Sequence, residues 1–123
     1  MNNAAKKILM VDDDSDLRML VGLYIKSAGY EVFQAINGED AKEQLKNLTP
    51  DLIVLDMMMP VLDGMGFLRW LRQEAKKDTP VLAFTSMAKS EIKSEVQTLG
   101  GTDIIFKPIE LERLVERIQK ILE

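Results

Sequence analysis

Five short apolar segments, each followed by a stretch with helical periodicity, constrain most strongly how this chain folds. The apolar segments lie at 7–11, 30–35, 52–55, 80–84 and 104–106. Most are continuous runs rather than alternations of apolar and polar residues, which is typical of strands buried on both faces of a parallel sheet. We therefore predict an α/β fold, a single doubly wound five-stranded parallel sheet with five helices.

The segments between these strands place apolar residues three and four positions apart, as one face of a helix does. The first predicted helix spans 16–28, and Asp14 or Ser15 can cap its start. Met19 and Leu23 lie off its main apolar face. The apolar face of this first helix consists of Leu17, Leu20, Val21, Tyr24 and Ile25. The apolar faces of the four later helices consist, in chain order, of Ala41, Leu45 and Leu48; of Phe67, Leu68 and Leu71; of Ile92, Val96 and Leu99; and of Leu111, Leu114, Val115, Ile118, Ile121 and Leu122.

Length and charge limit the classes of protein to which the chain can belong. Its 123 residues suit one domain, which we place at 1–123. A net charge of −4 argues against direct binding of nucleic acid, which needs a basic surface. No apolar run approaches the roughly 18 residues of a membrane span, and 1–7 lacks the apolar core of a signal peptide. We expect a cytoplasmic protein that contacts no membrane.

The absence of cysteine and histidine narrows the chemistry further. Disulfides, thiolate ligands, thiol nucleophiles and Ser-His-Asp triads are excluded, and the chain itself cannot carry a phosphohistidine. Any bound cation must be held by oxygen ligands, which leaves Mg²⁺, Ca²⁺ and Mn²⁺ as the candidates.

Polar residues stand at the carboxyl ends of four of the five predicted strands. Asp12 and Asp13 follow the first, Asp56 the third, Thr85 the fourth and Lys107 the fifth. In open parallel sheets these ends form the ligand-binding edge, so we expect the five side chains to meet there. Neighbouring carboxylates repel one another, and a divalent cation relieves that repulsion. A carboxylate beside such a cation can act as the nucleophile toward a phosphoryl group.

Four segments carry a resemblance to a known family. They read VDDD at 11–14, DMMMPVLDG at 56–64, FTS at 84–86 and FKP at 106–108. With these, the chain resembles the receiver domain of response regulators, the phosphate-accepting switches of two-component signalling, from end to end. The resemblance implies a flavodoxin-like sheet with strand order 2-1-3-4-5.

The resemblance also implies a magnesium-dependent phosphoacceptor site. Asp56 corresponds to the phosphoacceptor. Asp13 and Asp56 correspond to direct Mg²⁺ ligands, Asp12 to a residue that acts mainly through water, and the backbone carbonyl of Met58 to a further ligand. The donor would be a sensor histidine kinase or a histidine phosphotransfer protein. The chain would promote only its own phosphorylation and dephosphorylation, and would signal to a downstream protein that its sequence does not identify.

Two further positions correspond to the switching machinery of the family. Thr85 matches the switch hydroxyl, and Lys107 the lysine that pairs with the phosphoryl group. The bond before Pro108 is expected to be cis, which X-Pro bonds tolerate. The chain departs from the family at Ile104, where an aromatic ring commonly reports the activated state by turning inward. How switching works with Ile104 therefore stays open.

Two further expectations follow from the same resemblance. Met58 and Met87 occupy the positions that help or hinder an attacking water. Because both are apolar, we expect slow loss of the phosphoryl group. Met19 and Leu23 lie on the helix that often contacts the phosphohistidine donor in this family, so they are candidates for donor docking.

Two other classes of protein share part of the pattern. A phosphatase of the haloacid dehalogenase type also uses an aspartate nucleophile with Mg²⁺, but it needs a second aspartate where this chain has Met58. A flavodoxin-type electron carrier has the same layers. Its first loop binds a phosphate group, which the carboxylates at 12–14 would repel.

Overall fold

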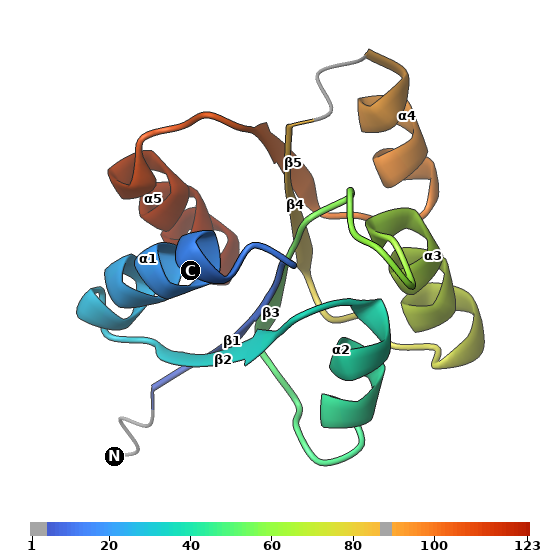
Figure 1. Cartoon of the computed structure of the whole chain (residues 1–123), viewed down its shortest axis with the longest axis horizontal. Coiled ribbons are helices and arrows are strands. Elements are labelled where there is room, and N and C mark those ends of the chain that lie inside the picture. The colour runs from blue at the N-terminus through green and yellow to red at the C-terminus, as the bar shows by residue number, and fades with distance from the viewer. Residues whose placement is uncertain (1–4, 87–89) are drawn as a thin grey trace.

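The computed structural model describes residues 5–86 and 90–123, apart from the side chains of residues 90 and 91. One five-stranded parallel sheet with strand order β2-β1-β3-β4-β5 runs through it, as predicted (Figure 1). The elements are β1 (Lys7–Val11), α1 (Ser15–Ser27), β2 (Glu31–Ala35), α2 (Gly38–Gln44), β3 (Leu52–Leu55), α3 (Gly64–Arg69), the π-helical segment η1 (Trp70–Glu74), β4 (Val81–Thr85), α4 (Ser90–Thr98), β5 (Asp103–Phe106) and α5 (Leu111–Leu122). Within the described residues, no helix is long and apolar enough to cross a membrane.

Helices cover both faces of the sheet. Figure 1 shows α1 and α5 on one face, and α2, α3 and α4 on the other. Each face has its own apolar cluster, one built around Leu9, Ile53 and Phe67, the other around Ile8, Val54 and Phe84. All residues from 8 to 11 and from 52 to 55 are fully buried, which explains why β1 and β3 are continuous apolar runs.

Asp14 begins helix α1. Its Oδ1 accepts a hydrogen bond from the backbone N–H of Leu17 at 3.1 Å, which decides between the two predicted caps. The buried face of α1 consists of Val21, Gly22 and Ile25. It packs against the sheet and α5.

The predicted buried face of α1 is too wide. Leu20 and Tyr24, which were expected on that face, are exposed, as are the off-face residues Met19 and Leu23. The sheet and α5 cover only a narrow stripe of α1, so apolar residues on both flanks remain in contact with solvent. We call Met19, Leu20, Leu23 and Tyr24 the α1 apolar patch.

The third helix changes its hydrogen-bonding pattern after Arg69. The backbone N–H of Ala75 donates to the carbonyl of Trp70 at 2.9 Å, a five-residue step that defines the π-helical segment. The wider turn keeps Leu71 in the core and leaves Trp70 partly buried, with its ring centroid 5.8 Å from that of Phe67. The apolar periodicity did not predict this widening.

Candidate functional site at the carboxyl end of the sheet

The ends of the two central strands bring three carboxylates together. Val11 and Leu55 are direct partners in the β1–β3 ladder, so Asp12 and Asp56 follow side by side. One carboxylate oxygen from each of Asp12, Asp13 and Asp56 lies within 4.8 Å of the others. Asp12 and Asp56 are buried, whereas Asp13 is exposed at the mouth of the cluster. The predicted acidic cluster is therefore present.

Lys107 reaches into this cluster from the end of β5. Its Nζ donates to Asp12 Oδ2 at 2.9 Å and lies 3.7 Å from Asp56 Oδ2. The same ammonium group lies 5.0 Å from the centroid of the Phe84 ring, which adds a cation–π contact. The bond between Lys107 and Pro108 is cis, as the family resemblance implies. Lys107 is thus the cation that neutralises part of the charge of the cluster.

Thr85 ends β4 beside this lysine. Its side chain is fully buried, and its carbonyl accepts a hydrogen bond from the backbone N–H of Lys107 at 2.8 Å. Thr85 is the ladder partner of Phe106, which directly precedes Lys107. The predicted hydroxyl and the predicted lysine therefore stand on adjoining strand ends, on the β4–β5 side of the carboxylates.

Burial controls the protonation of Asp56. The pKa of its carboxyl group is raised from 3.8 to about 6, mainly by removal from water and also by the nearby charge of Asp12. The backbone N–H of Met58, which donates to Asp56 Oδ1 at 3.0 Å, and the charge of Lys107 lower the pKa and so limit this rise. Without a bound cation, the surroundings of Asp56 therefore favour its protonated form more than water does.

The donor set fits a hard divalent cation. Three carboxylates converge without histidine or cysteine, and oxygen ligands are those that magnesium, calcium and manganese prefer. A cation there would offset the repulsion between Asp12 and Asp56, which a single lysine offsets only in part. The acidic cluster can therefore hold a metal ion.

The loop after Asp56 approaches its own strand end closely, and Gly64 makes that approach possible. A Cβ atom at this position would lie 2.5 Å from the carbonyl oxygen of Asp56 and 2.5 Å from the Cα of Met57. Any side chain at Gly64 would displace the backbone that carries Asp56. This contact gives a physical reason for the glycine at the end of the 56–64 motif.

Sequence reasoning missed two contacts that position Asp12. Arg18 Nη1 donates to the carbonyl of Asp12 at 2.6 Å, and its Nε donates to Gln34 Oε1 at 3.3 Å, which ties the end of β1 to β2. The backbone N–H of Asp14 donates to Asp12 Oδ1 at 2.9 Å. An arginine in the second turn of a helix gives no sequence signal for such a role, because its partners are backbone and side-chain groups set by the tertiary fold.

The structure describes one of the two methionines that were expected to influence an attacking water. Met58 is 53% exposed, and its sulfur lies 3.7 Å from the Ser86 hydroxyl, which donates to it. Its backbone amide contacts Asp56, as described above. The role of its carbonyl as a metal ligand stays a prediction. Met87 lies outside the described residues.

Ile104, the departure from the family pattern, is buried in the cluster that also contains Ile92 and Val96 of α4. Its side chain therefore already packs inward, beneath α4. An aromatic ring that alternates between exposed and buried positions has no counterpart at this residue.

Comparison with known proteins agrees with this architecture. The family described as response regulator receiver domain matches residues 8–119. The probable transcriptional regulator ycf27 of Pyropia yezoensis is 36% identical over 99% of this chain and 49% of its own length. The phosphate regulon transcriptional regulatory protein PhoB of Pseudomonas aeruginosa is 34% identical over 95% of this chain and 52% of its own length. The chain thus spans about half the length of these relatives.

A solved structure shows the same fold. The chemotaxis protein CheY4 of Vibrio cholerae superposes with a TM-score of 0.90 at 33% identity, covering 97% of this chain and all of CheY4. These matches give no support to the phosphatase alternative. The chain belongs to the response regulator receiver domain family and is a receiver domain of two-component signalling.

Proposed function

We propose that residues 1–123 form a receiver that accepts a phosphoryl group on Asp56 with the help of Mg²⁺. The observation that carries this proposal is the meeting of Asp12, Asp13, Asp56 and Lys107 at one edge of the sheet. A buried carboxylate among other carboxylates stabilises no fold by itself, whereas a phosphoryl-transfer site needs this combination of acidic ligands and a cation.

In the proposed reaction, a carboxylate oxygen of Asp56 attacks the phosphorus of a phosphohistidine. The P–N bond breaks, its electron pair returns to the imidazole of the donor, and an aspartyl phosphate forms. The Met58 amide holds Oδ1 of Asp56, so the carboxylate is oriented before attack. When bound, Mg²⁺ would neutralise charge on the phosphoryl oxygens. The carboxylates of Asp13 and Asp56 and the Met58 carbonyl would hold it directly, with Asp12 acting mainly through water.

Lys107 and Thr85 then respond to the new charge. Lys107 now lies closer to Asp12 than to Asp56, and an added phosphoryl group would draw its ammonium group toward Asp56. Thr85 would donate its hydroxyl to a phosphoryl oxygen. Because the two residues share a backbone hydrogen bond, their movements are expected to be coupled. Phosphorylation would thereby shift an existing equilibrium between two surfaces of the domain.

The output surface would comprise α4, β5 and α5, as the family resemblance implies. Ile104 packs with Ile92 and Val96 of α4, so a shift of the β4–β5 ends would reach α4 through aliphatic contacts rather than through a turning ring. The downstream partner is a protein target or an effector domain. The names of relatives twice as long identify them as transcriptional regulators, yet this acidic domain itself is not expected to bind nucleic acid.

The phosphoryl donor would be a sensor histidine kinase or a histidine phosphotransfer protein in the cytoplasm. Helix α1 starts three residues after Asp12, so the α1 apolar patch lies on the helix that directly follows two members of the acidic cluster. Exposed apolar side chains of this kind suit a protein partner that must bring its phosphohistidine to Asp56. The domain would catalyse only its own phosphorylation and dephosphorylation.

The test is phosphorylation by a small-molecule donor, such as acetyl phosphate, in the presence of Mg²⁺. We expect wild-type protein to gain one phosphoryl group, and Asp56→Asn to gain none, in intact-protein mass spectra. Asp16→Asn, which changes an exposed carboxylate in the first turn of α1, serves as the matched control and should be labelled like the wild type. Labelling of Asp56→Asn to the wild-type extent would show that another residue is the acceptor.

A further inference from the structure

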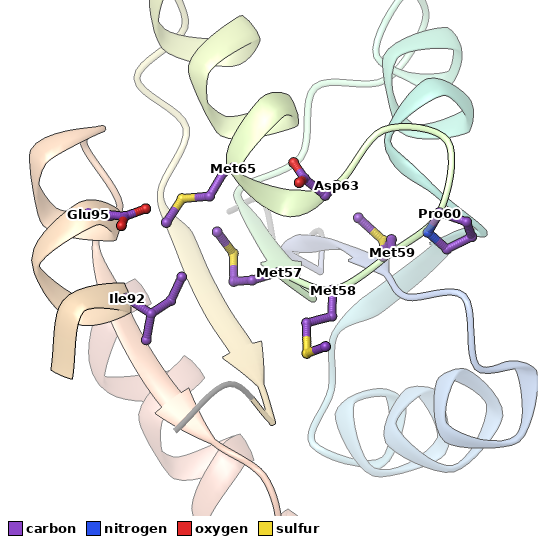
Figure 2. A pocket seen from close by; sticks show the side chains of 8 residues that line it. All are labelled: Met57, Met58, Met59, Pro60, Asp63, Met65, Ile92 and Glu95. Atoms are coloured by element: carbon purple, nitrogen blue, oxygen red, sulfur yellow. The ribbon is translucent and has the colours of Figure 1, made fainter. Parts of the chain in front are cut away.

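Met58 differs from its neighbours in its access to solvent. Met57 and Met59, on either side of it, are 3% and 9% exposed, against 53% for Met58. Met10 is fully buried in the sheet, and Met19 on α1 is the other strongly exposed methionine among the described residues. Figure 2 shows Met57 and Met58 lining the same pocket, with their side chains extending from the loop in different directions. These exposed fractions predict that a soluble oxidant reaches Met58 more readily than its two sequence neighbours.

The exposed sulfur lies beside the proposed acceptor. Met58 follows Asp56 by two residues, and its amide is hydrogen-bonded to Asp56 Oδ1. Its sulfur contacts the hydroxyl of Ser86, the residue directly after Thr85. The thioether thus connects the loop after β3 with the residue that follows β4, next to the proposed acceptor.

We propose that Met58 is a modification site, and that its oxidation to the sulfoxide by a peroxide shortens the life of the phosphoryl group on Asp56. This inference rests on the proposed function. In the step itself, the sulfur lone pair attacks one oxygen of hydrogen peroxide and an S–O bond forms. The O–O bond breaks and water leaves. Sulfur is oxidised by two electrons and the peroxide is reduced.

The change in chemistry predicts the direction of the effect. A thioether is a weak hydrogen-bond acceptor and cannot orient a water molecule for attack on phosphorus. A sulfoxide is polar, and its oxygen is a strong acceptor, so oxidation converts an apolar cover into a group that binds water at the phosphoryl site. Because a sulfoxide can be reduced enzymatically, the modification would be reversible.

The first measurement concerns selectivity and does not depend on phosphorylation. The folded protein is treated with increasing hydrogen peroxide, and oxidation at each methionine is followed by peptide mass spectrometry. We expect Met58 and Met19 to oxidise several-fold faster than Met57 and Met59. In denatured protein, where all are exposed, the four rates should converge.

The second measurement concerns the lifetime of the phosphoryl group, with each variant compared before and after peroxide treatment. Oxidation should shorten the lifetime several-fold in wild type and in the matched control Met19→Leu, which removes the distant exposed sulfur. Met58→Leu, which cannot be oxidised at this position, should show no change on treatment. Met58→Gln, whose amide oxygen imitates the sulfoxide acceptor, should lose phosphate faster than Met58→Leu without any oxidant.

These outcomes separate the inference from the function on which it rests. Equal oxidation rates at Met57 and Met58 in the folded protein would overturn the inference alone, as would a lifetime in Met58→Leu that still shortens with peroxide. Failure of the untreated wild type to take up phosphate would overturn the proposed function, and the inference with it. Restoration of the long lifetime by a methionine sulfoxide reductase would support the inference.

Discussion

The interior and the ends of β1 and β3 are equally buried and yet chemically opposite. From 8 to 11 and from 52 to 55 every side chain is apolar and shielded from water, and the residue that directly follows each strand is a buried aspartate. Burying an apolar side chain stabilises the fold by about 1.5–3 kcal/mol, whereas burying a carboxylate lowers stability unless a partner compensates. Asp12 has Lys107 at 2.9 Å, while Asp56 has it only at 3.7 Å.

This difference indicates which part of each strand holds the fold together and which part serves the site. Truncation of the apolar side chains in the strand interior is expected to lower the stability of the fold. Substitution of the aspartates at the strand ends is expected to stabilise the metal-free fold and to impair phosphorylation. Four changes test this contrast.

Truncation in the interior should have the largest effect. Leu55→Ala removes a fully buried side chain one residue before Asp56, and we expect a loss of about 2–5 kcal/mol in the free energy of unfolding. Leu23→Ala on the exposed patch of α1 is the matched control and should change stability by less than about 0.5 kcal/mol. Urea denaturation of both variants measures the difference. Equal losses would contradict the contrast between the buried strand and the exposed patch.

The second test uses pH. Because the pKa of Asp56 is about 6 in the folded protein and near 3.8 when unfolded, the folded state holds this proton more tightly. As pH rises from about 4 to 6, the unfolded chain gives up the proton first, so metal-free protein loses up to about 3 kcal/mol from this group. The loss is nearly complete at pH 6 and ends about one pH unit above it.

Asp56→Asn removes that titration. In the absence of metal, the variant should be more stable than wild type at pH 7.5, and the two should converge near pH 4. Thermal or urea unfolding of both proteins in EDTA across this range gives the difference directly, since the other carboxyl groups are common to both. A constant difference between the proteins at every pH would contradict the raised pKa of Asp56. Added Mg²⁺ should stabilise wild type more than the variant.

The third test concerns the loop that carries the site. Gly64→Ala places a Cβ atom 2.5 Å from backbone atoms of residues 56 and 57, so we expect a loss of about 1–3 kcal/mol and weaker labelling of Asp56. Gly22→Ala is the control. Its Cβ would lie at an ordinary distance of 3.4 Å from the nearest atom, inside helix α1, and should be neutral or stabilising. Wild-type stability in Gly64→Ala would show that the loop adapts easily.

The smallest effect is expected at the exposed member of the cluster. Asp13→Asn removes one repelling charge, so metal-free protein should melt at a slightly higher temperature, while Mg²⁺ should bind more weakly. Calorimetry with and without Mg²⁺ measures both changes, with Asp16→Asn as the control for the loss of an unrelated carboxylate. Clear destabilisation of metal-free Asp13→Asn would mean that this carboxylate supports the fold.

Much of the fold was predictable because burial on both sides of a parallel sheet requires continuous apolar strands. The predicted strands agree with the observed ones to within one residue at each end. The acidic cluster was predictable for a related reason, since parallel strands bring their carboxyl ends to one edge. Asp12 and Asp13 meet Asp56 there although more than forty residues separate Asp56 from them in the sequence.

Other features depend on how elements pack, and sequence periodicity does not report that. Leu20 and Tyr24 have the spacing of a buried face, but how far a neighbour covers α1 is decided by the position of α5. The contact of Arg18 with the carbonyl of Asp12 depends on the conformation of a long side chain. The π-helical turn at Trp70 likewise has no signal in the apolar periodicity, although Leu71 within it is fully buried.

Each group to which we assign a chemical role in phosphoryl transfer stands at a strand end or in the loop directly after it, and none lies within a helix. The outer helices are thus left to determine recognition. Their solvent-facing residues can diverge under selection for new kinases or targets without disturbing the reaction centre. A scaffold with this division of labour is suited to being duplicated and rewired into separate signalling circuits.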